Sequence, residues 1–182
     1  MGIDLPLIWA VIIIFGVMMY VVMDGFDLGI GMLFPSVKGE HDRDVMLTTV
    51  APVWDGNETW LVLGGAGLFG AFPMAYSVVL EALYLPLILV LIALIFRGVA
   101  FEFRFKAKRT RHVWDAAFIW GSIVATFAQG VVLGAFIEGI KVENRQFAGG
   151  AFDWLAPFPL FCGAGLVAGY AMLGCAWLLM KT

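Results

Sequence analysis

Acidic side chains occur inside apolar stretches of this sequence, where charged groups are costly. Asp24 and Asp27 lie late in the first apolar stretch, and Asp55 and Glu58 lie early in the second. An aspartate at the centre of a membrane helix costs about 2.5–3.5 kcal/mol on insertion scales, so such residues usually face a protein interior or a water-filled cavity. The members of each pair are three residues apart and project from one face of a helix. Carboxyl groups held in this way can bind and release protons or pair with cations.

Further polar residues belong to the same set. Asn57 lies between the two acidic residues of the second stretch, and Glu102 and Lys106 stand four apart where the third stretch ends. If the three stretches cross a membrane in turn, all of these side chains gather at one end of it. The sequence therefore predicts that five carboxylates and one lysine converge at one depth from three helices.

Other interpretations of these residues stay open. Asp24 and Asp27 lie close enough to an expected interface to cap a helix or to pair with a nearby cation. Glu102 and Lys106 have ordinary ion-pair spacing, which is worth about 0.2–0.5 kcal/mol on an exposed helix. Asp55 precedes a long run of apolar and small residues. Its position favours a functional or networked role.

The amino-acid composition indicates whether water or lipid surrounds the segments that carry these polar groups. The chain has 62% hydrophobic and 14% charged residues and a mean hydropathy of +0.95, whereas a soluble domain has about 45–50% apolar and about 25% charged residues. The charged residues fall in short stretches, and the runs between them are long enough to cross a bilayer at roughly 20 residues each. We expect an all-α integral membrane protein.

Five apolar runs predict about five transmembrane helices in one membrane domain, residues 1–182. The expected helices cover residues 5–33, 51–72, 78–104, 116–137 and 157–180. Small residues recur four apart in several of them, which lets helix backbones approach closely in lipid. Examples are the pairs Gly25/Gly29, Ala66/Gly70 and Gly165/Gly169. We therefore expect the helices to form a bundle.

The basic residues predict the orientation. Nine of the eleven lysine and arginine residues are expected on one side of the membrane, six of them between Arg97 and Arg111. Lys141 and Arg145 are expected on the other side. Cytoplasmic loops carry the excess of such residues, so the N-terminus is expected outside. The basic segment is interpreted as a solvated cytoplasmic anchor and not as a nucleic-acid site.

Four motifs of this sequence resemble motifs of one family. They are DGFDLG at Asp24–Gly29, DGNETWLV at Asp55–Val62, FRGVAFEFR at Phe96–Arg104 and GYAMLGCAWLLMKT at Gly169–Thr182. In this order and spacing they resemble the N-terminal half of subunit II of the cytochrome bd-type quinol oxidases, and their details lean toward the cyanide-insensitive branch.

The resemblance implies a subunit of a respiratory enzyme in the bacterial cytoplasmic (inner) membrane. In that family a heterodimer oxidises quinol and reduces oxygen to water, with two b-type haems and one d-type haem in subunit I. Subunit II lacks haem ligands and is thought to bring cytoplasmic protons toward the oxygen-reducing site. This chain is therefore expected to bind no haem or metal itself, and its expected partners are the haem-bearing subunit I, quinol and membrane lipids.

The resemblance also assigns roles to the polar residues. Those that match the family's proton entry path are Asp55, Glu102 and Lys106. Those expected to form a supporting polar cluster are Asp24, Asp27, Asn57 and Glu58. No residue of this chain is expected to be catalytic.

The histidines agree with a chain that holds no redox centre. A haem in a helix bundle needs an axial donor that projects into its interior, but His41 and His112 lie in charged stretches outside the expected spans. The same two histidines, without a CxxC motif, do not form a zinc site.

The length of the chain leads to a further expectation. The family's subunit II is roughly twice as long and contains a second bundle. We therefore expect a truncated or split polypeptide, in which a four-helix bundle is followed by the first helix of a missing second bundle.

Two other functions stay open at this point. Intramembrane carboxylates and glycine-rich helices also occur in proton-coupled secondary transporters, although these place coupling residues near the midplane on broken helices. The second alternative is a purely structural scaffold for a haem-bearing subunit. Replacing Asp55 with a neutral side chain separates a scaffold from a proton path, because only the proton path needs the titratable group.

Overall fold

The chain folds almost entirely into helices. In residues 4–182, which the computed structural model describes, there are six α-helices, one short 3-10 turn and one small hairpin. The helices are α1 (Leu5–Leu33), α2 (Glu40–Val50), α3 (Trp54–Ala71), α4 (Pro73–Lys106), α5 (Arg111–Glu138) and α6 (Pro157–Lys181), and the 3-10 turn η1 is Phe34–Ser36. The strands β1 (Val142–Glu143) and β2 (Gln146–Phe147) pair antiparallel. The all-α fold class is confirmed.

Long helices form over all five predicted ranges. Within the described part of the chain, four are long and apolar enough to cross a membrane, namely α1 with η1, α4, α5 and α6. α3 is not among them, because Asp55, Asn57 and Glu58 lie in its first two turns. The chain is therefore an integral membrane protein in which one long helix begins with polar residues.

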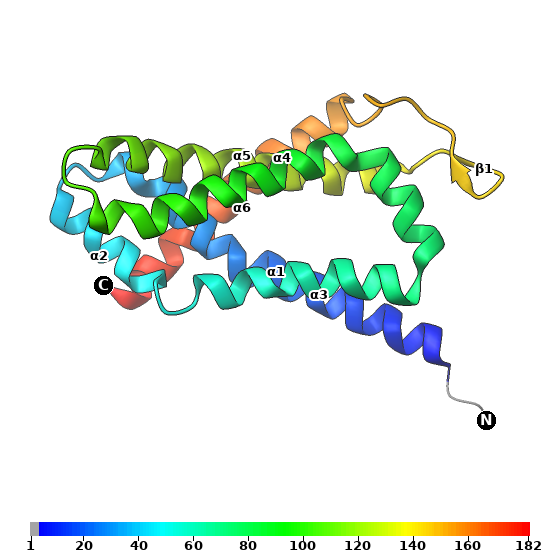
Figure 1. Ribbon diagram of the computed structural model, residues 1–182, viewed down its shortest axis with the longest axis horizontal. Coiled ribbons are helices and arrows are strands. Elements are labelled where there is room, and N and C mark those ends of the chain that lie inside the picture. Colours follow the sequence, from blue (N-terminus) through cyan, green and yellow to red (C-terminus); the bar gives the residue numbers. More distant parts are fainter. Residues whose placement is uncertain (1–3) are drawn as a thin grey trace.

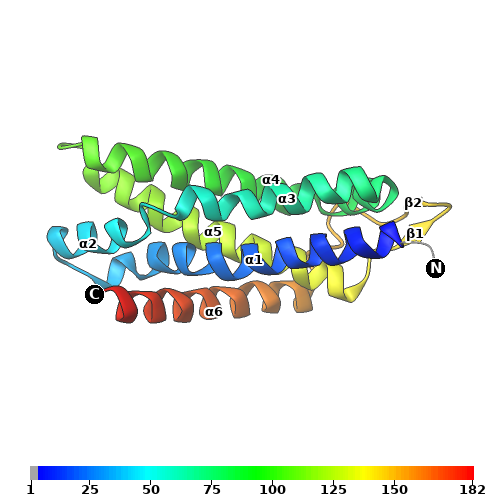
Figure 2. The same cartoon turned by 90° about the horizontal axis from the view of Figure 1, so that it is seen from below.

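The long helices lie side by side along one axis (Figure 1). α1, α4 and α6 run in one direction and α3 and α5 run back, so that α2, the α4–α5 turn and the C-terminus lie at the same end (Figure 2). We call this the α2 end. The opposite end holds the start of α1 and the β1–β2 hairpin, and we call it the hairpin end.

Close backbone contact joins α1 to α6. A Cβ atom at Gly29 would overlap the carbonyl oxygen of Tyr170, and one at Gly174 would lie 2.6 Å from the carbonyl carbon of Gly29. Glycine removes these clashes, as expected for helices that pack in lipid. Nothing lies within 4 Å of a Cβ built at Gly165 or Gly169, so this pair mediates no such contact. α6 packs along both α1 and α5 and thus belongs to the bundle formed by the preceding helices.

A kink divides α4 near the hairpin end. Leu83 has non-helical dihedrals (φ −121°, ψ 16°), and Pro86 follows three residues later. Proline has no N–H to donate to the carbonyl of Ala82, and its ring crowds the preceding turn. The segment before the kink runs across the long axis of the bundle (Figure 1).

One arginine of the basic segment is buried at the α2 end, although the segment was expected to be solvated. Arg104 is 1% exposed and forms ion pairs with Asp44 of α2 and Asp115 of α5. Arg43 lies 3.0 Å from the other oxygen of Asp115, and Arg111 also contacts Asp44. We call these five residues the Arg104 cluster. It attaches the short helix α2 to α4 and α5.

The charge of Asp44 reflects these contacts. Partial burial alone would raise the pKa of its carboxyl group, but hydrogen bonds from Arg104 and Arg111 and the charges of both guanidinium groups outweigh burial and lower the pKa. Asp44 is therefore held as a carboxylate, as an ion-pair partner requires.

Candidate functional site

Three helices bring polar side chains together inside the bundle. Asp24 on α1 and Arg97 on α4 are 0% and 1% exposed, and Glu58 on α3 is partly buried. Nη1 of Arg97 lies 2.9 Å from Oε1 of Glu58 and 4.0 Å from Oδ1 of Asp24. The Arg97 guanidinium also lies over the Phe118 ring, 5.8 Å from its centre, which suits a cation. Arg97 is thus the charged centre of the site.

Asp27 and Asn57 complete the site. Asp27 lies three residues after Asp24 on the same face of α1 and is fully buried. The side-chain amide of Asn57 donates to Oδ2 of Asp27 at 2.7 Å and to the carbonyl of Met23 at 3.1 Å. We call Asp24, Asp27, Asn57, Glu58 and Arg97 the Arg97 cluster. The four residues predicted as a supporting polar cluster therefore lie together, around an arginine that was not predicted to join them.

Several polar atoms of the Arg97 cluster make no hydrogen bond within it. Among the described residues, both carboxyl oxygens of Asp24, Oδ1 of Asp27, and Nε and Nη2 of Arg97 are buried without a hydrogen-bond partner. Buried polar groups are usually paired, and groups left over in this way mark sites for bound water or for proton exchange. The cluster also sets three carboxyl groups against one guanidinium. It can therefore hold protons as well as charge.

The placement of Arg97 corrects the interpretation of the basic segment. Arg97 was counted among the solvated cytoplasmic residues, but it lies inside the bundle, seven residues before Arg104. A signal was present in the sequence, because the fifteen residues between Glu81 and Arg97 are all uncharged, which places Arg97 at the end of a long apolar run. Two intramembrane aspartates require a cation nearby. Arg97, at the end of an apolar run, fits that requirement.

A second polar group lies one turn away from Asp24. The side-chain amide of Gln129 on α5 donates to the hydroxyl of Tyr20 on α1, and the hydroxyl of Tyr170 on α6 donates to Oε1 of Gln129 at 3.4 Å. Tyr20 and Tyr170 are 5% and 2% exposed. Because Tyr20 precedes Asp24 by four residues on α1, this group continues the polar side of that helix. This group was not predicted from the sequence, although an amide inside an apolar span was a usable signal.

The residues predicted to form the proton path lie outside the Arg97 cluster. Glu102 and Lys106 are 60% and 78% exposed on the outer face of α4, with Oε2 and Nζ 4.0 Å apart. Asp55 is exposed in the first turn of α3 and precedes Glu58 by three residues on the same side of that helix. Of the three residues, Asp55 is thus the one that shares a helix face with a member of the Arg97 cluster, Glu58.

The histidines do not fit a haem inside this bundle. His41 and His112 are both exposed at the α2 end, on α2 and at the start of α5. An axial ligand must project into the interior, next to the porphyrin face. Neither histidine lies in such a position.

Comparison with known proteins places the chain in a family. Residues 5–182 match the family model described as cytochrome bd terminal oxidase subunit II. The chain belongs to the cytochrome bd terminal oxidase subunit II family. The motifs that resembled this family therefore correspond to a match along nearly the whole chain, and the recognition made from the sequence is confirmed.

Individual members of the subunit II family show the extent of the similarity. The chain is 37% identical over 186 residues to the probable cytochrome oxidase subunit 2 of Haemophilus influenzae, covering 98% of this chain and 49% of that protein. It is 36% identical over 171 residues to the cytochrome bd-I ubiquinol oxidase subunit 2 of Escherichia coli, covering 90% and 45%. It is 39% identical over 124 residues to the cytochrome bd ubiquinol oxidase subunit 2 of Bacillus subtilis, covering 66% of this chain and 37% of that protein. The chain spans about half the length, or less, of these relatives.

Proposed function

We propose that this chain is the haem-free subunit of a terminal quinol oxidase that reduces oxygen to water. The match of residues 5–182 to the subunit II family carries this proposal, and the relatives named as ubiquinol oxidase subunits support it. The partner is a haem-bearing subunit I with two b-type haems and one d-type haem. In this scheme electrons come from quinol in the partner, and this chain supports that subunit and supplies protons.

The α2 end is proposed to face the cytoplasm of the bacterial cell. Arg97 lies inside the bundle, but eight other basic residues lie at or near the α2 end, whereas Lys141 and Arg145 lie at the hairpin end. The positive-inside rule then orients the chain with its N-terminus outside. Protons would enter from the side that carries α2.

The proton path is proposed to begin at exposed residues of the α2 end and to pass the Arg97 cluster. Glu102 and Lys106 collect protons at the surface, and Asp55 passes them along its helix face to Glu58. The observation that supports this step is the set of unpaired oxygens on Asp24 and Asp27, which can hydrogen-bond to water inside the bundle. Protons must reach an oxygen-reducing site through a low-dielectric interior, and titratable groups with internal water provide such a route.

The Asp55→Asn variant tests the proton path. Asparagine keeps the shape of the side chain but cannot carry a proton, so quinol oxidase turnover of the assembled complex should fall at least tenfold, equal to about 1.4 kcal/mol of barrier. Haem content should stay normal. Glu102→Gln should lower turnover less, because neighbouring surface groups can also collect protons.

Asp42→Asn is the matched control, because Asp42 is exposed on α2 at the same end of the chain. It should leave turnover unchanged. An Asp55→Asn complex that is fully assembled and turns over like the parent would reject the proton path and leave the scaffold function.

A further inference from the structure

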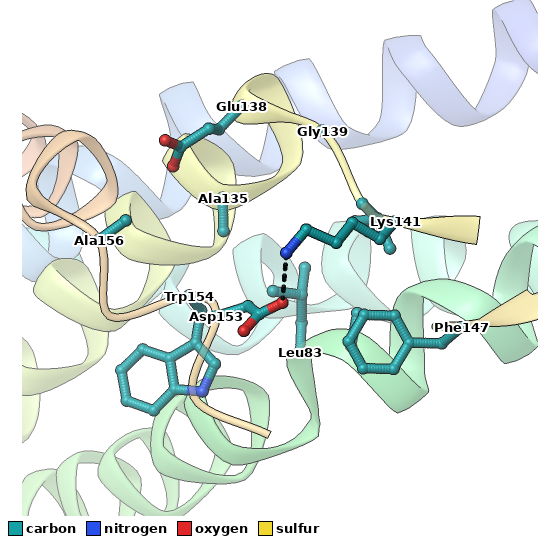
Figure 3. A pocket seen from close by; sticks show the side chains of 11 residues that line it. Leu83, Ala135, Glu138, Gly139, Lys141, Phe147, Asp153, Trp154 and Ala156 are labelled. Carbon is teal, nitrogen blue, oxygen red and sulfur yellow. Dashed lines mark hydrogen bonds and ion pairs between the residues drawn. The ribbon is translucent and has the colours of Figure 1, made fainter. Parts of the chain in front are cut away.

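A cavity of about 400 Å³ lies at the hairpin end, and no residue of the Arg97 cluster lines it (Figure 3). It is enclosed by the kink of α4 and by the segment that joins α5 to α6. Leu83, Ala82 and Ala135 form its floor and are all less than 9% exposed. The cavity is therefore a recess between two helices with an apolar floor, covered by a loop.

Two aromatic side chains form the walls. The Trp154 indole N–H donates to the carbonyl of Ala151 at 2.8 Å, which fixes the orientation of its ring, and Phe147 lies on the other side (Figure 3). Aromatic faces attract cations at short range. Tryptophan is also frequent where a membrane protein meets lipid head groups.

Charged side chains form the rim. Nζ of Lys141 lies 3.5 Å from Oδ2 of Asp153, and Glu138 lies at the edge of the same cavity (Figure 3). The side chains of Lys141 and Asp153 are 74% and 47% exposed, so the ion pair is weak and can open for a ligand. Two carboxylates and one ammonium at one opening match a ligand that carries a cation together with a single anionic group.

This charge set decides between ligand classes. A quinol ring is neutral and leaves all three charges of the rim unused. An anionic phospholipid with no amine would bring its phosphate to an opening with two carboxylates, Glu138 and Asp153, against one lysine. A zwitterionic head group with an ammonium and a phosphate pairs with every charged group of the rim.

The depth of the cavity also fits a lipid head group. From Leu83 to Lys106, α4 contains 24 residues, which span about 36 Å at 1.5 Å per residue. A hydrocarbon core of about 30 Å therefore ends near the kink. The segment of α4 before the kink runs across the bundle axis at this level (Figure 1). The recess opens where phospholipid head groups lie.

We propose that this cavity binds the head group of an ethanolamine phospholipid from the adjoining leaflet. The ammonium donates to Glu138 and Asp153 and lies against the face of Trp154, and Lys141 pairs with the phosphate. The acyl chains stay in the bilayer. This inference rests on the membrane-spanning fold and does not depend on the oxidase function.

The test uses the assembled complex that contains this chain, stripped of lipid in detergent. Phosphatidylethanolamine is added, and bound lipid is counted by native mass spectrometry. The parent should retain it, and the Glu138→Gln/Asp153→Asn double variant should retain at least about fivefold less, because charge-assisted hydrogen bonds to the ammonium are lost. Glu143→Gln, on the exposed strand β1 and outside the cavity, is the matched control and should retain as much as the parent.

A second measurement needs no variant. The parent should prefer phosphatidylethanolamine over phosphatidylcholine and phosphatidylglycerol with the same acyl chains. Phosphatidylcholine lacks N–H donors, and phosphatidylglycerol lacks the cation. Equal retention of the three lipids, or retention of quinone instead, would overturn the proposal. Displacement of the lipid by free phosphoethanolamine at equal concentration would overturn the lipid assignment and identify a soluble ligand.

Discussion

Two arginines on one helix lie in opposite electrostatic situations. Arg97 and Arg104 are both 1% exposed and stand seven residues apart, two turns along the buried face of α4. Around Arg104, three arginines meet Asp44, Asp115 and the nearby Glu40, so positive and negative groups are equal in number. Around Arg97, one guanidinium pairs with Asp24 and Glu58, and a third carboxyl group, that of Asp27, is buried in the same cluster.

The difference shows how the same residue type serves two purposes. A balanced set of charges near the end of a helix attaches one element to others. It has no excess negative charge that binding a proton would neutralise. A set with excess carboxyl groups, deeper in the bundle, gains from taking them up, because each uncompensated buried charge is costly. We infer that the Arg104 cluster is structural and that the Arg97 cluster is the part of the chain adapted for protons.

The largest effect is expected for Arg97→Met. The substitution keeps the length of the side chain but leaves three carboxyl groups without their cation, and breaking a buried ion pair in this way costs about 3–5 kcal/mol. The amount of assembled complex in the membrane should fall steeply, measured by its haem absorbance. Asp24→Asn in the same chain should restore part of it, because one buried carboxylate is then removed.

Arg109→Met is the control for this prediction. Arg109 belongs to the same basic segment but is exposed, so its loss should leave assembly normal. If Arg97→Met assembled as well as Arg109→Met, the Arg97 cluster would not depend on its cation and the comparison with Arg104 would lose its meaning.

A smaller effect is expected for Arg104→Met. The change leaves Asp44 and Asp115 with their remaining arginine partners, so the cost should be about 1–3 kcal/mol. The effect should be local, and hydrogen exchange of the α2 amides, residues 40–50, should become faster while turnover per assembled complex stays close to the parent value. Loss of turnover without faster exchange in α2 would show that this cluster also belongs to the proton path.

The smallest effect is expected for the contribution of Asp44 to stability at acidic pH. Because the folded state lowers the pKa of this carboxyl group, its contribution to stability is complete above the unfolded pKa of about 3.9 and is lost as pH falls below that value. The melting temperature of the parent should therefore exceed that of Asp44→Asn by a constant amount from pH 7 to pH 5, and the difference should shrink below about pH 4. A difference that vanished between pH 7 and pH 5 would contradict the lowered pKa.

Hydropathy alone was enough to predict the five long helices of this chain. The five apolar runs became five long helices because each run must pair its backbone groups internally in lipid. The polar start of α3, with Asp55, Asn57 and Glu58, explains why this helix is less apolar than the others. α2 was not predicted, since Glu40–Val50 has no long apolar face and its position depends on contacts made by Arg104.

The candidate site was harder to predict, because the direction of a side chain depends on packing. The sequence was enough to predict that four polar residues lie close together, because they share one depth in the membrane. These residues are Asp24, Asp27, Asn57 and Glu58. Arg97 was missed because an arginine near the end of an apolar run usually marks an interface, and here the helix continues for nine residues to Lys106. The outward direction of Glu102 follows from the inward direction of Arg97 and its neighbours, which only the packed helices reveal.

The buried carboxyl groups of α1 also affect how the protein is made. Synthesis proceeds from the N-terminus, and Arg97 follows Asp27 by seventy residues. At roughly 5–20 residues per second, the aspartates therefore exist for roughly 4–14 s before their cation leaves the ribosome. During this interval the apolar residues ahead of them must hold α1 in the bilayer. Arrival of α4 then supplies the missing charge, and from that moment α1 can leave the membrane only by breaking an ion pair.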